Sequence, residues 1–469
     1  MTTTSHAYFP TATLVTLAAA ALTASLGISV ASVLLPTLAR SFSATVSEVQ
    51  FVVLSYLLSV TVTIVTAGRL GDLFGHRKVL IAGLLIFMTA SVLCAVAPTL
   101  NLLIAGRAVQ GIGGAVLIAL SMSLARQLIP TERLGTAMGL LGTTSAIGTA
   151  LGPSLGGAIL TLGNWQMAFW LLAAIAGGVF VLSVTVIERS DPPKGATFKD
   201  LDCLGTLLLM ATLILYGFAA SGKTSLLPIS TNVLILGALI TSVFFVIIER
   251  RATSPLVPMT LLKDRTTGTG FIMNIAVGTV MMSTLVVGPF FLSFSLELNE
   301  AVIGLVLAVG PAVTALSGFP AGRLTDRFGA FQIMIVGILQ MIAGLLCLAF
   351  LPRYFGVYGY VGALIVLTPA FQMFLAANNT AVLAKASKDQ QGRLSGLLGL
   401  SRNLGLMTGA SAMSTLFVIV LGTGNAAQAP VNEVADAFSI TFVLAAALTS
   451  TTLLIALFSR VGQNTRETK

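Results

Sequence analysis

The stretch GRLGDLFGHR occupies residues 68–77, and a close copy, GRLTDRFGAF, occupies residues 322–331. A second pair follows the same pattern: GLLGTTSAIGTALGPSLGG at 139–157 is echoed by GLLGLSRNLGLMTGASAMS at 396–414. The copies are 254 residues apart in the first pair and 257 in the second. Two matches at nearly the same spacing indicate that the chain consists of two homologous halves.

The chain around these copies is mostly apolar. Of its 469 residues, 56% are hydrophobic and 9% are charged, and its mean hydropathy is +0.98. A soluble globular domain usually has about 25% charged residues. Apolar runs long enough to cross a hydrocarbon layer of about 30 Å recur throughout, without the alternating pattern of a barrel strand. The composition therefore predicts an all-α polytopic membrane protein.

The apolar runs predict fourteen transmembrane helices. They cover residues 12–35, 49–67, 79–97, 100–125, 134–161, 166–187, 203–219, 231–248, 268–296, 303–321, 332–351, 357–377, 394–421 and 438–459. Combined with the repeat, this pattern predicts an N-terminal six-helix bundle (1–187), a segment of linkers with two additional helices (188–267), and a C-terminal six-helix bundle (268–469).

The distribution of Lys and Arg predicts the orientation. With both termini in the cytoplasm, 20 of the 25 basic residues fall on the cytoplasmic side, as the positive-inside rule requires. The other five are Arg40, Lys223 and Arg353 outside and Arg107 and Arg402 within spans. We expect a multi-pass protein of a bacterial inner membrane. Its net charge of +9 suits contact with anionic lipid, and no nucleic-acid partner is expected.

Three motifs resemble those of the major facilitator superfamily. The loop between the second and third predicted spans matches its loop motif at Gly68, Asp72, Gly75, Arg77 and Lys78. LIAGRAVQGIGGA at 103–115 resembles its fourth-span motif. The fifth-span motif associated with exporters is matched at Gly148, Gly152, Pro153, Gly156 and Gly157. Over nearly its whole length the chain is similar to the fourteen-span drug:proton antiporters of this superfamily, the multidrug and antimicrobial efflux type.

This resemblance implies two pseudo-symmetric helical bundles that rock around a central site and export small organic molecules. It also implies that the charged loop after residue 68, with Asp326 in its second copy, forms a latch that closes the cytoplasmic face. The glycines and proline of the fifth span would act as a hinge. The alternative for the loop is a topogenic role alone, and the alternative for the glycines is ordinary helix packing.

Polar side chains within the spans are candidates for substrate binding or coupling. Arg107 is the most informative, because a guanidinium inside a span costs about 2.5–3.5 kcal/mol on insertion scales. Gln110 lies one turn further along the same face, and Arg402 is the second interior charge. Asn274, Asn378 and Asn379 are the amide candidates. For all of these, the alternative is structural hydrogen bonding between helices.

The chain differs in the first span from the family that it resembles. Many members carry an acidic residue there, but in LGISVASVLLP (26–36) the corresponding position is Gly27, and no Asp or Glu lies deep in any predicted span. A proton-for-cation exchanger needs a buried carboxylate. The sequence therefore favours neutral or weakly acidic substrates. It leaves Asp72, Glu48, Asp202 or the substrate itself as candidate proton carriers.

Other functional classes fit the sequence less well. An enzyme within the membrane needs a convergent nucleophile or metal set, and the predicted spans contain no histidine or deep carboxylate. No Walker-type nucleotide motif is present, and no cofactor or metal is expected. A channel would need a pore ring rather than two repeated halves. We expect a monomeric secondary transporter with proton coupling; the second hypothesis is uptake or exchange of an organic anion without proton antiport.

Overall fold

The computed structural model describes residues 11–128, 131–187, 203–220, 230–251, 264–384 and 388–467. In these ranges all regular secondary structure is helical, which confirms the predicted all-α fold class. The first seven helices are α1 Thr11–Ser41, α2 Val46–Val49, α3 Phe51–Phe74, α4 His76–Ala95, α5 Leu100–Leu128, α6 Thr131–Leu162 and α7 Gln166–Val186. They are followed by α8 Cys203–Ala220, α9 Thr231–Glu249, α11 Arg265–Val286, α12 Gly288–Phe294, α13 Glu300–Phe328, α14 Ala330–Leu383, α15 Lys388–Leu421 and α16 Val431–Glu467.

Each of the fourteen predicted spans falls on a helical segment. Among the described residues, eleven helices are long and apolar enough to cross a membrane, and shorter apolar helices cover 147–161 and 204–219. One of the eleven, α14, is 54 residues long and contains two predicted spans. At its kink, Gly356 has φ 53° and ψ −130°, a region that glycine enters without a Cβ clash. This residue allows the chain to turn between the two spans.

The ninth predicted span, 268–296, consists of two helices. The first, α11, ends at Val286, and α12 begins at Gly288 with Pro289 in its first turn. Proline lacks an N–H group and is tolerated best at the start of a helix, where that group has no partner within the helix.

The helix ends meet at two opposite faces of the molecule. Val46 N donates to Gly424 O (3.0 Å), which brings together the turns after α1 and α15. At the other face, Arg265 Nη2 donates to Phe458 O (3.2 Å). Since the predicted orientation places the first face outside the cytoplasm, we call it the outer end and the other the inner end.

The closest helix pair is the same in both halves. In the first half, α6 packs on α1 so tightly that a Cβ on Gly148 would lie 2.7 Å from Leu22 O. In the second half, α15 packs on α11, and a Cβ on Gly405 would collide with Ile275 O. Gly405 corresponds to Gly148 in the repeat. Glycine is needed at both positions because the neighbouring backbone occupies the place of a side chain.

The glycines of the predicted hinge contact two different partners. Gly152 and Gly156 also lie against α1, whereas Gly157 faces the other half, where its Cβ would lie 2.9 Å from Gly304 Cα on α13. The α6 helix continues through Pro153. This motif therefore holds one half together and joins it to the other half, while bending at Pro153 during transport stays a prediction.

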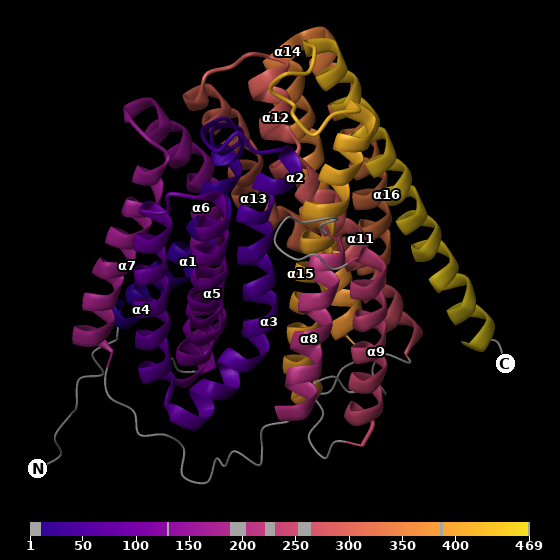
Figure 1. The fold of residues 1–469 in the computed structure, drawn as a ribbon. Coiled ribbons are helices and arrows are strands. Elements are labelled where there is room, and N and C mark those ends of the chain that lie inside the picture. The colour runs from indigo at the N-terminus through magenta and orange to yellow at the C-terminus, as the bar shows by residue number, and fades with distance from the viewer. Residues whose placement is uncertain are drawn as a thin grey trace, which may run out of the picture.

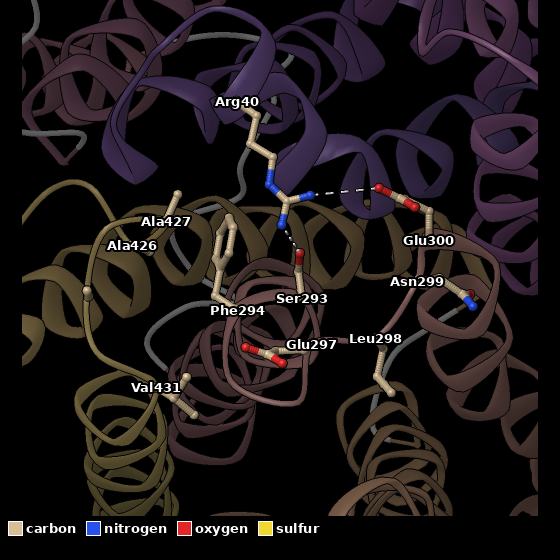
Figure 2. Close-up of a pocket in the computed structure, with 11 residues that line it drawn as sticks. Arg40, Ser293, Phe294, Glu297, Leu298, Asn299, Glu300, Ala426, Ala427 and Val431 are labelled. Carbon is tan, nitrogen blue, oxygen red and sulfur yellow. Dashed lines mark hydrogen bonds and ion pairs between the residues drawn. The ribbon is translucent and has the colours of Figure 1, made fainter.

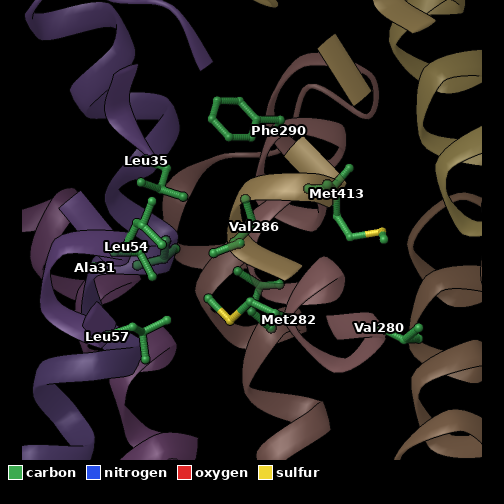
Figure 3. Close-up of a cluster of buried hydrophobic side chains, with 14 of the residues drawn as sticks. Ala31, Leu35, Leu54, Leu57, Val280, Met282, Val286, Phe290 and Met413 are labelled. Carbon is green, nitrogen blue, oxygen red and sulfur yellow. The ribbon is translucent and has the colours of Figure 1, made fainter. Parts of the chain in front are cut away.

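Apolar side chains fill the space between the halves at the outer end. Leu35 and Leu54 of the first half point toward Val286 and Phe290 of the second (Figure 3), and each of these side chains is at most 1% exposed. Together with the contact between α6 and α13, this cluster closes the outer end of the interface.

The two helices from the middle of the chain lie along a second seam. In Figure 1, α8 and α9 stand side by side, with the first half to their left. The α8 helix touches α3 of the first half and α15 of the second. Tyr216 OH and Thr408 Oγ1 are 2.6 Å apart in a hydrogen bond, and Gly217 lies against Leu58. The added helix α8 thus contacts both halves.

Gly152→Ala is expected to destabilise the protein, because the new methyl group would meet Ser29 Oγ and Val30 N on α1. Overpacking of this kind costs about 1–3 kcal/mol, so the Tm of the purified protein in detergent should fall. The control is Gly178→Ala on α7, where nothing lies within 4 Å of the new Cβ. Equal Tm values for the two variants would contradict a tight α1–α6 contact.

Candidate functional site

Arg107 lies inside the N-terminal bundle and is completely buried. Its Nε donates to the Val52 carbonyl of α3 (2.8 Å), and its Nη1 donates to Gln110 Oε1 on α5. The Tyr56 ring lies beneath the guanidinium, with its centroid 4.3 Å from Cζ. A desolvated cation–π contact is worth about 2 kcal/mol or more. Arg107 and Gln110 therefore meet within one half, away from the interface between the halves.

Gln110 extends this network to a third helix. Its Nε2 donates to Ser91 Oγ of α4 (2.6 Å). The glycines that follow it bring the helices close enough for these bonds: a Cβ on Gly111 would lie 2.8 Å from the Ser59 side chain, and one on Gly113 would lie 2.7 Å from Phe87 N. The fourth-span motif thus locks α5 against α3 and α4 around a buried cation.

Tyr56 fills the space beside Gly27, the position where many family members carry an acid. A Cβ on Gly27 would lie 3.0 Å from both Tyr56 OH and the Phe87 ring. The Tyr56 hydroxyl donates to Ala24 O (2.9 Å). The positive charge of Arg107 is therefore balanced by a ring face, a carbonyl and an amide rather than by a carboxylate from α1.

The predicted amides of the second half mostly join helices. Asn274 Nδ2 donates to Leu398 O and to Ser401 Oγ (both 2.9 Å), which ties α11 to α15. Asn378 Nδ2 donates to Gly270 O (3.2 Å), which ties α14 to α11. Asn274 and Asn378 are each 1% exposed. Both side chains are buried inside the second half.

Arg402 and Asn379 differ from these buried amides, because both side chains are exposed. Arg402 directly follows Ser401 on α15, next to the Asn274 hydrogen bonds. No described contact joins Arg402 to Arg107. Arg402 and Asn379 are therefore the predicted polar candidates whose side chains are not covered by the protein in this structure.

The two copies of the charged loop have the same backbone turn. Gly75 separates α3 from α4 with φ 92° and ψ 126°, and Gly329 separates α13 from α14 with φ 87° and ψ 147°. Side chains other than glycine rarely adopt a positive φ, so both sharp turns require this residue. The repeat in sequence is thus a repeat in conformation.

The described residues of the predicted latch have different surroundings. Arg77 donates to Ile187 O (2.6 Å) and to Val184 O (2.8 Å), both at the end of α7 in its own half. Gly68 has no close neighbour at its Cβ position, and Lys78 and Asp326 are exposed. The Asp72 side chain is outside the described part of the structure. The latch role stays a prediction, for a state in which the outer end is open.

The candidate proton carriers have different environments. Glu48 caps α2, where its Oε2 accepts from Thr45 N (2.8 Å) and Thr45 Oγ1 (2.9 Å). Asp202 lies outside the described residues. Sequence reasoning counted Glu249 as part of a cytoplasmic linker, but it is 2% exposed at the inner end of α9 and is the one buried carboxyl group among the described residues.

A polar contact between the halves, not predicted from the sequence, lies at the outer end. Arg40 at the end of α1 is 3.8 Å from Glu300 and donates to Ser293 Oγ (3.2 Å), both in the second half. Its guanidinium also lies over Phe294. Figure 2 shows these groups around a cavity of about 500 Å³ that Glu297 also lines. In the sequence, this contact is indicated only by Arg40 being one of the few basic residues predicted to lie outside the cytoplasm.

Two repeated sets of spanning helices, which contact each other through glycines and apolar side chains, have the architecture of a membrane transporter. The sequence model of the Major Facilitator Superfamily matches residues 17–293 and 239–469. The chain belongs to this superfamily and is a transporter of small molecules.

Relatives with curated names agree with this assignment. The chain is 28% identical to the uncharacterized transporter YebQ of Escherichia coli, with 83% of this chain and 85% of that protein covered. It is 28% identical to the riboflavin transporter RibZ of Clostridioides difficile (83% and 84% covered). It is 26% identical to the multidrug resistance protein Stp of Mycobacterium tuberculosis (82% and 72% covered).

Solved structures share the fold. A bacterial homolog of the human lysosomal transporter Spinster, in an inward-facing and occupied conformation, matches with a TM-score of 0.70 and 14% identity over 95% of this chain and 96% of that one. The nucleoside transporter NupG matches with a TM-score of 0.65 and 15% identity over 96% and 98% of the two chains.

Arg107→Met removes the buried charge but keeps a long side chain. Gln110 Oε1 and the Val52 carbonyl lose their donor and the contact with Tyr56 is lost, so we expect a moderate fall in Tm. If the charge serves transport, the transport rate in cells falls at least tenfold. Arg107→Ala is the control for lost packing and should lower the Tm. If the Arg107→Met protein folds and transports at the wild-type rate, the guanidinium has a structural role only.

Arg40→Gln is expected to loosen the outer end, because the contact with Glu300 is lost. The readout is the rate at which a membrane-impermeant thiol reagent labels Leu35→Cys from outside, in a background without the native cysteines. An exposed ion pair contributes up to about 1 kcal/mol, so labelling should rise up to about fivefold. Arg353→Gln breaks an ion pair within the second half, with Asp436 (2.8 Å), and should not change the rate. Equal labelling rates in both variants would show that Arg40 does not help to close the outer end.

Proposed function

We propose that this transporter exports small organic molecules, neutral or weakly acidic, across a bacterial inner membrane. One observation carries the proposal: among the described residues the one buried carboxyl group, Glu249, is at the inner end of α9 rather than near the middle of a span. A cationic substrate would find no fixed negative charge in the described core. Uncharged compounds, or anions paired with Arg402, avoid that desolvation cost.

Export is supported by the fifth-span motif and by the name of one relative, the multidrug resistance protein Stp. The name of a second, the riboflavin transporter RibZ, makes riboflavin a reasonable test compound. We further propose that the protein works as a monomer with both termini in the cytoplasm. It draws energy from an ion gradient and carries out no enzymatic reaction.

We propose proton coupling as the energy source. Glu48 is held in the cap that it makes with Thr45, which counts against it as the carrier. Asp72 in the latch and Asp202 before α8 remain candidates, and the burial of Glu249 adds a fourth. A weakly acidic substrate can also carry the proton itself.

The second candidate is uptake or exchange of an organic anion without proton antiport. The exposed Arg402 favours it, because a guanidinium on a spanning helix can pair with a carboxylate or phosphate. The Arg402→Gln variant separates the two candidates: anion exchange should be lost, while export of neutral compounds should persist.

The test is transport in oriented proteoliposomes with an imposed pH gradient. The panel contains riboflavin, the neutral antimicrobial chloramphenicol and the weak acid benzoate. With one proton exchanged per substrate, a gradient of one pH unit supports about tenfold accumulation, because each tenfold ratio costs about 1.4 kcal/mol. If substrate accumulation does not depend on the pH gradient, transport is not coupled to proton exchange. Accumulation only in the inward direction would support the uptake alternative.

A further inference from the structure

A second cavity, of about 530 Å³, lies on the side of the bundle between α3, α5 and α8. The α3 helix forms its floor, because α5 and α8 both pack on α3 (Figure 1). The lining residues belong to the apolar helical segments 46–64, 100–125 and 204–219. The mouth of this groove therefore faces lipid acyl chains rather than water. At its rim, Ile112 and Ile214 are each 39% exposed.

Small residues keep the groove open. Ala105 and Ala108 lie on the α5 wall, and Gly217 lies on the α8 wall. Larger apolar residues would fill the space between α5 and α8, as they do elsewhere in the protein. The volume is in the range of sites that bind drug-sized molecules, about 300–1,000 Å³.

The groove contains hydroxyl groups but no charge. None of its lining residues is ionisable, and Ser55, Ser59 and Thr63 follow each other at four-residue intervals along one face of α3. An ion entering from the bilayer would find no opposite charge in the groove, whose polar lining consists of these hydroxyls and the Asn101 amide. The lining therefore selects uncharged molecules with an apolar body and a hydrogen-bonding group.

Ser55 supplies a second, independent indication of a ligand. The residue is 8% exposed, and its Oγ, which is closed off from the groove in this rotamer, has no hydrogen-bond partner among the described residues. Serines in helices commonly donate to the carbonyl one turn back, as Ser91 does to Phe87 O (2.7 Å). Leaving a buried hydroxyl unpaired costs about 1–3 kcal/mol. Rotation of the Ser55 side chain about χ1 would turn the hydroxyl into the groove, where an acceptor on a bound molecule would recover that free energy.

We propose that this groove is a binding site for uncharged amphipathic molecules that enter from the bilayer, with Ser55 donating a hydrogen bond to their acceptor atom. Reading the bound molecule as a transport substrate rests on the proposed function, whereas binding itself does not. The added helix α8 supplies one wall of the site. The site lies beside the interface between the halves, since Leu54 lines the groove and also faces Val286 and Phe290 in Figure 3.

The test uses Nile red, an uncharged dye with a carbonyl oxygen on an aromatic body, titrated into nanodiscs that hold the full-length protein. Saturable binding is expected above the signal of empty nanodiscs. Ser55→Ala should weaken it about tenfold through the lost hydrogen bond, with no fall in Tm because the hydroxyl has no protein partner. Ala105→Phe should abolish it by filling the groove.

Two matched variants test the location. Ser183→Ala removes another buried hydroxyl without a partner among the described residues, on α7, and Ala174→Phe adds a ring to the exposed face of α7. Both should bind the dye with wild-type affinity. If Ser55→Ala and Ser183→Ala bind equally well, the proposed site is wrong.

Native mass spectrometry distinguishes a resident lipid from a dye-like ligand. One outcome would overturn the proposal: the wild type retains a phospholipid that Ala105→Phe loses, while dye binding is unchanged in both groove variants. The groove would then be a binding site for a lipid acyl chain. Failure of the export proposal is a separate result, because it comes from the direction of transport in proteoliposomes and leaves the dye titration unaffected.

Discussion

Helices inside a bilayer are held together by close contact rather than by exclusion from water, so small residues determine where two backbones can meet. Gly148 and Gly405 place this contact at the same position in each half, between α1 and α6 and between α11 and α15. Gly157 and Gly304 make a similar contact between the halves. That last contact involves no side-chain hydrogen bond, so the halves can separate there without leaving a polar group unpaired in lipid. The same packing rule thus determines both the contacts within each half and the contact between the halves.

Much of the fold could be predicted from the sequence, because its determinants are local. Apolar length predicts spans, and a glycine is required at each of the sharp turns at Gly75 and Gly329. The division between α11 and α12 was not predicted, since a proline within a long apolar run can mark either a kink in one helix or the start of a second helix. The neighbouring glycines Gly156 and Gly157 could not be assigned to different partners, because their contacts depend on tertiary packing.

The candidate site was less predictable for the same reason. Arg107 and Arg402 look equivalent in the sequence, as single charges in apolar spans. In the structure one is sealed among α3, α4, α5 and α7, and the other is exposed. The difference arises from neighbours distant in sequence: Tyr56 and Val52 accommodate one guanidinium, and no described contact covers the other. Ser55 and Arg40 were missed because their significance lies in a missing partner and in a contact across the interface.

The α3 helix connects these separate regions through adjacent residues. Leu54 faces the other half, Ser55 faces the lateral groove, and Tyr56 supports the buried Arg107. Because a helix moves as a rigid rod, a rotation of the first half that separates Leu54 from Val286 must also shift α3 against α8, which is held to the second half through Tyr216. The width of the groove is therefore tied to the opening of the outer end. A molecule that fits the groove in only one state would bias the rocking motion, as expected for a ligand with different affinities for two conformations.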